Sequence, residues 1–215
     1  MTLPAAAFMA LLTGLAVADG PGIDITKLEA VNAKVEAVTW KGAAAIKLAQ
    51  EKPADDALAI VKGETFRNGT LELDVAGLPG ASAGEGARGF IGLSFRIQDA
   101  THLETIYIRP TNGRAYDQLR RNHSVQYVSR PDWPWERLRK ETPGVYETYA
   151  DMQPGEWIHL KLVVKGRDAT LYVGSATQPT LLVHDLKLGE VAGGIGLWIG
   201  PGTDGYFKNL RILPG

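Results

Sequence analysis

Apolar and polar residues alternate along short stretches of the chain, a period of two that is typical of half-buried β-strands. In residues 70–75, three apolar side chains would point to one face and two carboxylates to the other. The same pattern predicts strands at 35–40, 44–48, 57–61, 91–98, 103–109, 124–128, 157–165, 169–173, 180–186, 194–199 and 206–212. About a dozen short strands predict an all-β chain in which two sheets pack face to face.

Residue pairs that favour tight turns separate these predicted strands. They are Asn68-Gly69, Asn112-Gly113, Pro154-Gly155, Lys165-Gly166 and Pro201-Gly202. Such pairs join adjacent antiparallel strands in hairpins. No internal repeat and no linker divides the sequence, so we expect one antiparallel β-sandwich domain over residues 19–215.

The first residues resemble a secretory signal peptide. Residues 3–17 are apolar apart from Thr13, and Ala16-Val17-Ala18 offers small residues where a signal peptidase cuts. No Lys or Arg precedes the apolar stretch, so the α-amino group alone would supply its positive charge. We expect a signal peptide at 1–18, a periplasmic or extracellular bacterial protein, and no membrane span after cleavage. The alternative is a buried N-terminal helix.

Composition excludes several kinds of chemistry. The chain has no cysteine, so it has no disulfide, thiolate zinc site, iron-sulfur cluster or cysteine nucleophile. Its 23 Lys and Arg nearly balance 24 Asp and Glu, giving a net charge of -1, which argues against a nucleic-acid partner. The four histidines show no metal-ligand spacing. The sequence indicates no cofactor and leaves a divalent cation open.

Basic and aromatic residues concentrate in one segment, where the predicted strands are further apart in the sequence. Between positions 109 and 140, eight basic residues oppose three acidic ones, so a neutral chain carries a local charge of +5. Long loops on a rigid sandwich often carry function. An acidic sugar or another small anion is therefore one ligand to consider.

Mixed aromatic and planar polar side chains are what sugar recognition needs, because rings stack on the C–H face of a pyranose while amide, carboxylate and guanidinium groups bond its hydroxyls. Strands at 91–98, 103–109 and 157–165 could place such residues on one shared face, with the basic segment beside it. The candidate ligand-binding residues are Arg96, Tyr107, Arg109, Arg114, Gln118, Arg120, Arg121, Asn122, Tyr127, Trp133, Trp135 and His159. The alternative is structural, with the arginines in salt bridges and the Trp133-Pro134-Trp135 run packed under a loop.

For catalysis, the candidate residues are His123, Glu104 and Asp117. His123 is the best general base, given its arginine-rich surroundings and the carboxylate of Asp117 six residues earlier. Two literal motif matches, G-x-S-x-G at 80–84 and G-x-G-x-x-G at 84–89, lead into a predicted strand rather than a helix. Both motifs need a helix, so we interpret residues 80–89 as a loop.

The C-terminal third of the chain resembles a known superfamily. Pro154-Gly155-Glu156-Trp157, the run 193–197 and the run 206–212 are similar to concanavalin A-like lectin and glucanase jelly rolls, in particular to the bacterial family named for 3-keto-disaccharide hydrolases, with laminin-G-like modules as relatives. The resemblance covers about residues 35–213. It departs from the family at Gly174-Ser175-Ala176, where members often have Asn-Gly.

This resemblance implies a jelly-roll sandwich that acts on carbohydrate. The hypotheses are a carbohydrate-binding or carbohydrate-processing domain whose partner is a sugar, including an acidic or oxidised one; an enzyme that cleaves 3-keto-glycosides; and a non-catalytic adhesion module. For cleavage, a carbonyl at C3 would acidify the neighbouring C–H, so a base and an arginine would suffice without paired carboxylates. Ordinary retaining glycanases of this fold carry Glu-x-Asp-x-Glu, whereas this chain has Ala76 in the last position of Glu72-Leu73-Asp74-Val75-Ala76.

Overall fold

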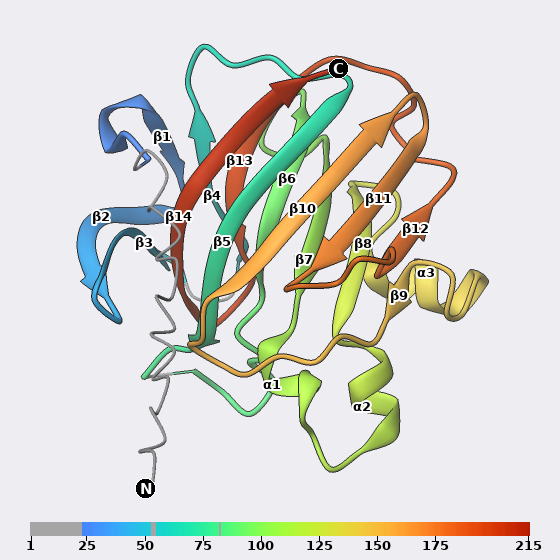
Figure 1. Cartoon of the computed structure of the whole chain (residues 1–215), viewed down its shortest axis with the longest axis horizontal. Helices are drawn as coiled ribbons and strands as arrows, with labels where there is room; N and C mark the ends of the chain where they lie inside the picture. Colours follow the sequence, from blue (N-terminus) through green and yellow to red (C-terminus); the bar gives the residue numbers. More distant parts are fainter. Residues whose placement is uncertain (1–22, 53–54, 82) are drawn as a thin grey trace, which may run out of the picture.

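Two antiparallel sheets of seven strands lie face to face in the computed structural model, which describes residues 23–52, 55–81 and 83–215 (Figure 1). Sheet A runs in the order β1 (Leu28–Val31), β4 (Ala57–Val61), β13 (Gly194–Ile199), β6 (Ile91–Ile97), β7 (Leu103–Ile108), β8 (Val125–Arg130), β9 (Glu147–Thr148). Sheet B runs β12 (Leu181–Val183), β11 (Asp168–Val173), β10 (Ile158–Lys165), β5 (Gly69–Pro79), β14 (Thr203–Pro214), β3 (Ala43–Gln50), β2 (Ala33–Trp40). This jelly-roll sandwich confirms the predicted fold class. The expected signal peptide and Ser82 lie outside the described residues.

The core fills the space between the sheets with the apolar sides of alternating strands. In β10, buried Ile158, Leu160 and Leu162 alternate with polar residues that face solvent. Strand β5 pairs with β10 so that Leu160 lies opposite Leu73, which places both side chains on the inner face. Burial of these apolar faces is the main force that holds the two sheets together.

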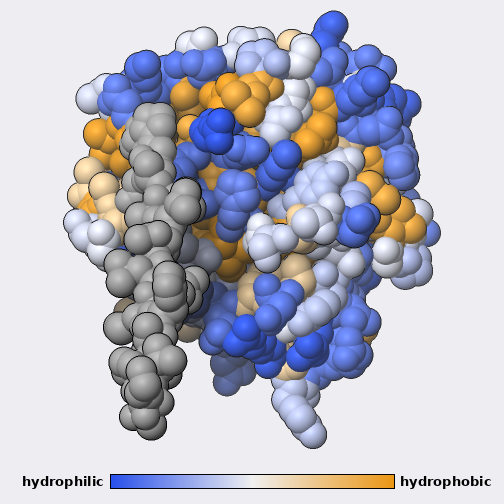
Figure 2. All heavy atoms as spheres, in the orientation of Figure 1, coloured by the Kyte–Doolittle hydropathy of each residue, from blue (hydrophilic) through white to orange (hydrophobic). Residues whose placement is uncertain are grey.

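The outer face of sheet B is a charged surface. Cross-strand neighbours there carry opposite charges, as in the pairs Lys161 opposite Glu72 and Lys47 opposite Glu36. Hydrophilic residues cover a large share of the surface seen from this side (Figure 2). Such pairs are a normal way to solvate one face of an antiparallel sheet.

Every predicted strand corresponds to an observed one, and the differences are short elements. Strand β1 lies before the first predicted strand, the two-residue strand β9 was not predicted, and β12 is shorter than predicted. The basic segment also contains three helices that the alternation did not predict: α1 (Pro110–Gly113), α2 (Gln118–Asn122) and α3 (Trp135–Glu141). A further 3-10 turn, η1 (Ile25–Lys27), precedes β1.

Between β5 and β6, the described residues 80–81 and 83–89 form no helix or strand, in agreement with the loop interpreted from the sequence. No helix follows either glycine motif among the described residues of this segment. Neither motif therefore has the helix that its chemistry requires.

Candidate functional site

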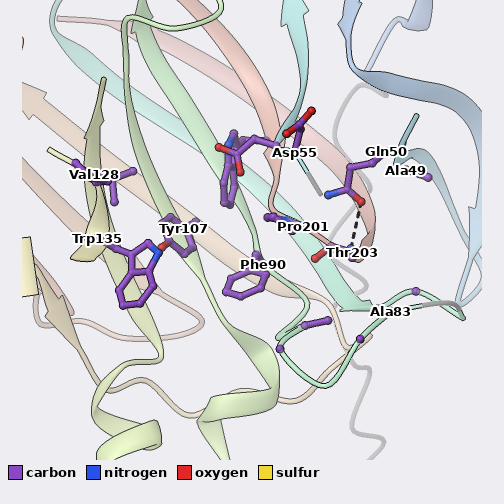
Figure 3. A pocket seen from close by; sticks show the side chains of 18 of the residues that line it. Ala49, Gln50, Asp55, Ala83, Phe90, Tyr107, Val128, Trp135, Pro201 and Thr203 are labelled. Atoms are coloured by element: carbon purple, nitrogen blue, oxygen red, sulfur yellow. Dashed lines mark hydrogen bonds between the residues drawn. The ribbon is translucent and has the colours of Figure 1, made fainter. Parts of the chain in front are cut away.

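A pocket of about 1110 Å³ opens on the outer face of sheet A. Phe90 and Tyr107 lie in its floor, between Trp135 on one side and the loop segment at Ala83 on the other (Figure 3). Trp198 also lines the pocket. Its volume lies just above the roughly 300–1,000 Å³ usual for small-molecule pockets. The pocket therefore has room for several linked rings.

Strand register explains why the aromatic rings share this face. Gly92 of β6 lies opposite Trp198 of β13 on one side and opposite Tyr107 of β7 on the other. Residues directly opposite each other across strands point to the same face, and the intervening isoleucines and leucines point into the core. Phe90 lies two residues before Gly92, so its side chain points to the same face of the sheet.

The floor is closely packed because Gly92 has no side chain. A Cβ on Gly92 would lie 2.6 Å from the Cα of Tyr107 and 2.2 Å from the carbonyl oxygen of Ile106. The rings of Tyr107 and Trp198 approach to 4.7 Å between centroids, and Phe90 meets Tyr107 edge-on at 6.3 Å. These contacts fix a preformed aromatic surface.

Trp135 begins α3 and presents its indole to the pocket. Trp135 is 38% exposed, and the guanidinium of Arg139 lies over its ring, 4.6 Å from the ring centroid. Arg139 is itself held by Glu147, which accepts hydrogen bonds of 2.7 to 3.1 Å from two of its nitrogens. Cation–π stacking on a fixed arginine holds the indole in place.

Arg109 does not line the pocket, but its guanidinium lies 5.0, 5.9 and 6.0 Å from the ring centroids of Tyr107, Phe90 and Trp135. It is 5% exposed and donates to the Tyr107 hydroxyl at 2.8 Å and to the His123 carbonyl at 2.9 Å. Burial lowers the pKa of Arg109. Burial also raises the pKa of Tyr107, and the positive charge of Arg109 opposes that rise. Both groups keep their usual protonation at neutral pH, so the bond between them persists.

An ion pair crosses the pocket between Asp56 and Arg130. Asp56 directly precedes β4, and Arg130 is the last residue of β8, so the pair joins strands on opposite sides of β13, β6 and β7. Burial raises the pKa of Asp56, and the charge of Arg130 and a hydrogen bond from the Trp198 side chain oppose that rise. The pair places a guanidinium and a carboxylate next to the aromatic floor.

Gln50 and Thr203 make a polar corner at the far end of the pocket. The side-chain oxygen of Gln50 accepts from the Thr203 backbone N–H at 3.3 Å, and its amide donates to the Gly200 carbonyl (Figure 3). Asp204 follows in the same wall, 3.2 Å from Lys47. These bonds fix the backbone of the 200–204 turn.

The predicted catalytic residues do not come together. His123 lies 3.2 Å from Glu147, and burial lowers its pKa, opposed by Glu147. Asp117 caps α2 by accepting from the Arg120 N–H at 3.0 Å. Glu104 is buried between the sheets. None of the three predicted residues lines the pocket.

Three predicted ligand residues lie away from the aromatic face, which corrects the expected shared face. The buried guanidinium of Arg96 turns inward at a β-bulge position with positive φ and donates to the carbonyls of Arg67, Gly166 and Gly189. Tyr127 points into the core, because strict alternation places it opposite Ile106 on the inner side. His159 lies on the outer face of sheet B, 2.8 Å from Asp74.

Most of the remaining predicted residues have partners within the basic segment or next to it. The contacts are Arg114 with Asp151, Gln118 with Asn122, Arg120 with Asn112, Arg121 with Tyr149, and Trp133 with Arg137 and Lys187. Of the predicted ligand residues, Tyr107 and Trp135 line the pocket.

Sequence reasoning missed most of the pocket lining, including Phe90, Trp198, Asp56 and Arg130. Alternation carried a signal for two of them. Trp198 lies between Leu197 and Ile199, and Phe90 directly precedes the apolar set of β6, so each has the parity of the outer face. Nothing local marked Asp56 or Arg130, because their pairing depends on the whole sheet.

Among the residues described, no group of three or more His, Asp or Glu side chains is placed to hold a metal ion. The helices within those residues are also too short or too polar to cross a membrane.

Comparison with known proteins identifies the fold. No protein-family model matches the chain, and no curated protein matches it in sequence. Among solved structures, the carbohydrate-binding module CBM66 from Bacillus subtilis is similar, with a TM-score of 0.59, 15% identity, and coverage of 86% of this chain and 93% of the module. A Bacillus subtilis protein of unknown function with a galectin-like fold has a TM-score of 0.56 at 10% identity, covering 89% and 95%.

Domain 4 of AbnA, an extracellular arabinanase of family GH43 from Geobacillus stearothermophilus solved with arabinotriose, has a TM-score of 0.51 at 14% identity. The structural similarity covers 94% of this chain and 85% of that domain. At such low identity these similarities show a shared jelly-roll β-sandwich fold.

Proposed function

We propose that this chain binds an oligosaccharide in the pocket on the outer face of sheet A. The observation that carries the proposal is the pocket lining, in which Phe90, Tyr107, Trp135 and Trp198 surround the Asp56–Arg130 pair. Preformed concave sites with aromatic walls and a few fixed polar groups are the usual form of a ligand site.

The chemistry of the lining suits a sugar. The exposed indole of Trp135 and the partly exposed ring of Phe90 offer flat apolar surfaces for the C–H faces of a pyranose or furanose, while Tyr107 and Trp198 are buried and pack against them or each other. Arg130 brings several N–H donors and Asp56 brings acceptors, which together match the neighbouring hydroxyls of a sugar ring. Because Arg109 and Arg139 already hold the rings in position, little side-chain entropy would be lost on binding.

The similar structures support this proposal at the level of fold. CBM66 is described as a carbohydrate-binding module, and domain 4 of AbnA was solved with a bound trisaccharide. A jelly-roll sandwich is thus a scaffold on which sugar binding occurs.

Binding, rather than cleavage, is the function that the geometry favours. The 3-keto-glycoside hypothesis needs a base beside the substrate, and a base must come within hydrogen-bonding reach of the proton it removes. Neither His123 nor Glu104 lines the pocket, and Glu104 is enclosed in the core.

Replacing Trp135 tests the proposal. We expect Trp135→Ala to weaken binding of the best ligand on a glycan array by about 10-fold or more, because one stacked ring contributes about 1–3 kcal/mol in comparable aromatic contacts. Isothermal calorimetry with that ligand measures the loss.

Tyr149→Ala is the matched control. Tyr149 is also 38% exposed and also lies under an arginine, Arg121, at 4.8 Å, yet it does not line the pocket. Binding by Tyr149→Ala should equal that of the unmodified protein. The proposal fails if no glycan binds, or if both variants lose affinity equally. Protein partners in a pull-down without sugar binding would instead support the adhesion-module hypothesis.

A further inference from the structure

The pocket carries a charge opposite to that of the segment beside it. Its lining contains four carboxylates, Asp55, Asp56, Glu136 and Asp204, and one guanidinium, that of Arg130. The described lining residues therefore have a net charge of -3, although the neighbouring stretch from 109 to 140 is basic.

Among the described residues that line the pocket, Arg130 is the one cation from that basic stretch, and it is paired with Asp56. Arg109 is buried and bonded to the Tyr107 hydroxyl, and Arg139 is bonded to Glu147. Arg137 bonds Glu141 at 2.9 Å on the exposed side of α3. The sequence-based expectation of an acidic ligand rested on these arginines, and the structure assigns them to other partners.

Two of the four carboxylates have no cation of their own. Asp56 is paired with Arg130 and Asp204 with Lys47. Asp55 and Glu136 are exposed and form no ion pair among the described residues. They come from different walls, since Asp55 lies in the connection before β4 and Glu136 in the first turn of α3.

Thr203 gives a second, independent sign that a polar ligand completes this pocket. The residue is 2% exposed and lines the wall beside Asp204, and its hydroxyl has no hydrogen-bond partner within the described part of the chain (Figure 3). Buried hydroxyls nearly always have a partner, so one without a partner points to a group that the chain itself does not supply.

We propose that the pocket selects sugar chains by charge, preferring those that carry amino groups, accepting neutral ones and rejecting uronates. Asp55 and Glu136 are the specificity-determining residues. This inference rests on the proposed sugar binding. A protonated amine on the ligand is attracted by both carboxylates, whereas a uronate carboxylate is repelled by them and meets no unpaired cation in the described lining.

The test compares glycans that differ only in charge. An array of β-1,4-linked glucose, glucosamine and glucuronate chains, together with other neutral, amino and acidic glycans, is read at about pH 6, where amine and carboxylate are both ionised. We expect each amino chain to bind about 2- to 5-fold more tightly than its neutral counterpart, the size expected for exposed charge pairs. Uronates should bind more weakly by a similar factor, and added salt should reduce both differences.

A double variant identifies the residues responsible. Asp55→Asn with Glu136→Gln should remove the charge preference, so that the ratio of amino-chain affinity to neutral-chain affinity falls to about one. The matched control, Glu64→Gln with Asp132→Asn, removes one Glu and one Asp at exposed positions outside the pocket and should keep the preference.

The outcomes separate this inference from the proposed function. Charge-independent binding of neutral and charged glycans that Trp135→Ala still weakens would overturn the charge selection alone. Tighter binding of uronates than of neutral chains would overturn it as well. If no glycan of any charge binds, both the inference and the proposed function fail.

Discussion

Glu104 shows how the position of a single side chain decides its role. Its carboxylate accepts a hydrogen bond of 2.8 Å from the Leu188 backbone N–H and another from the Tyr127 hydroxyl, and no water-exposed surface remains on the residue. Burial raises the pKa of Glu104, while these two bonds oppose the rise. The carboxyl of Glu104, which the sequence analysis named as a candidate catalytic residue, is therefore a buried structural group.

This raised pKa predicts how stability depends on pH. Because the folded protein holds the Glu104 proton more tightly than the unfolded chain, folding takes up a proton as the pH falls towards the raised pKa. The free energy of unfolding should therefore decline as the pH rises from about 4.5 through the folded pKa. In Glu104→Gln this contribution disappears.

Urea unfolding of both proteins between about pH 4 and pH 8 measures the difference, which we expect to be on the order of 1 kcal/mol across the range. Glu72→Gln serves as the control, because Glu72 lies on the outer face of sheet B beside Arg211. Parallel stability curves for Glu104→Gln and the unmodified protein would contradict the prediction.

At the scale of strands, the aromatic floor depends on the close approach of β6 to β7 at Gly92. Substituting alanine there would place a methyl group inside contact distance of the β7 backbone, which cannot move aside without disturbing the ladder. We expect Gly92→Ala to lower the free energy of unfolding by about 1–3 kcal/mol. We also expect it to weaken sugar binding, because Tyr107 and Trp198 flank this position.

Gly86→Ala provides the comparison. Gly86 belongs to the loop that lines the pocket, and a Cβ there meets no atom within 4 Å. Chemical denaturation and calorimetry should find Gly86→Ala close to the unmodified protein. A stable Gly92→Ala protein with full affinity would show that the floor does not need this close contact.

The same scale explains what the sequence could and could not predict. Strands β5 and β10 follow from alternation, because their inner faces are buried while most residues of the opposite face are less buried. Strand β6 is buried along its whole length, yet its large apolar residues still alternate with Gly92, Ser94 and Arg96 in the sequence. The short helices were missed because they depend on local caps, such as the Asp117 side chain on α2, rather than on a long apolar period. Trp133 and Trp135 are two residues apart, yet the first packs against the core and the second lines the pocket, a difference fixed by the start of α3 between them.

Across the whole molecule, the Asp56–Arg130 pair couples the pocket to stability. It connects the start of β4 with the end of β8, so no short-range sequence pattern could reveal it. The sequence predicts the face of the sheet to which the aromatic side chains point, because that follows from alternation along each strand. It does not predict which polar residues meet across the sheet. The pair is also asymmetric, because Asp56 is the more enclosed side chain, 22% exposed against 40% for Arg130.

Removing the arginine should therefore cost more stability than removing the carboxylate. Arg130→Gln leaves a mostly buried negative charge without its partner, and we expect a loss of about 1–3 kcal/mol at neutral pH. Asp56→Asn leaves a cation that still reaches water and should cost less. In the double variant, part of the loss caused by Arg130→Gln should be recovered, which a double-mutant cycle measures directly.

The pH dependence of that loss identifies its cause. Without Arg130, the pKa of Asp56 should rise further, since burial is the main influence on it and Arg130 opposes burial. As the pH falls from about 7.5 to about 5, a larger share of Asp56 should be protonated in Arg130→Gln than in the unmodified protein, which restores part of the lost stability. Arg211→Gln, which breaks an exposed pair with Glu72, should cost less than about 1 kcal/mol at either pH. If Arg130→Gln stays equally unstable at both pH values, the loss comes from packing of the arginine stem rather than from the unpaired carboxylate, and the pair does not couple the pocket to stability by charge.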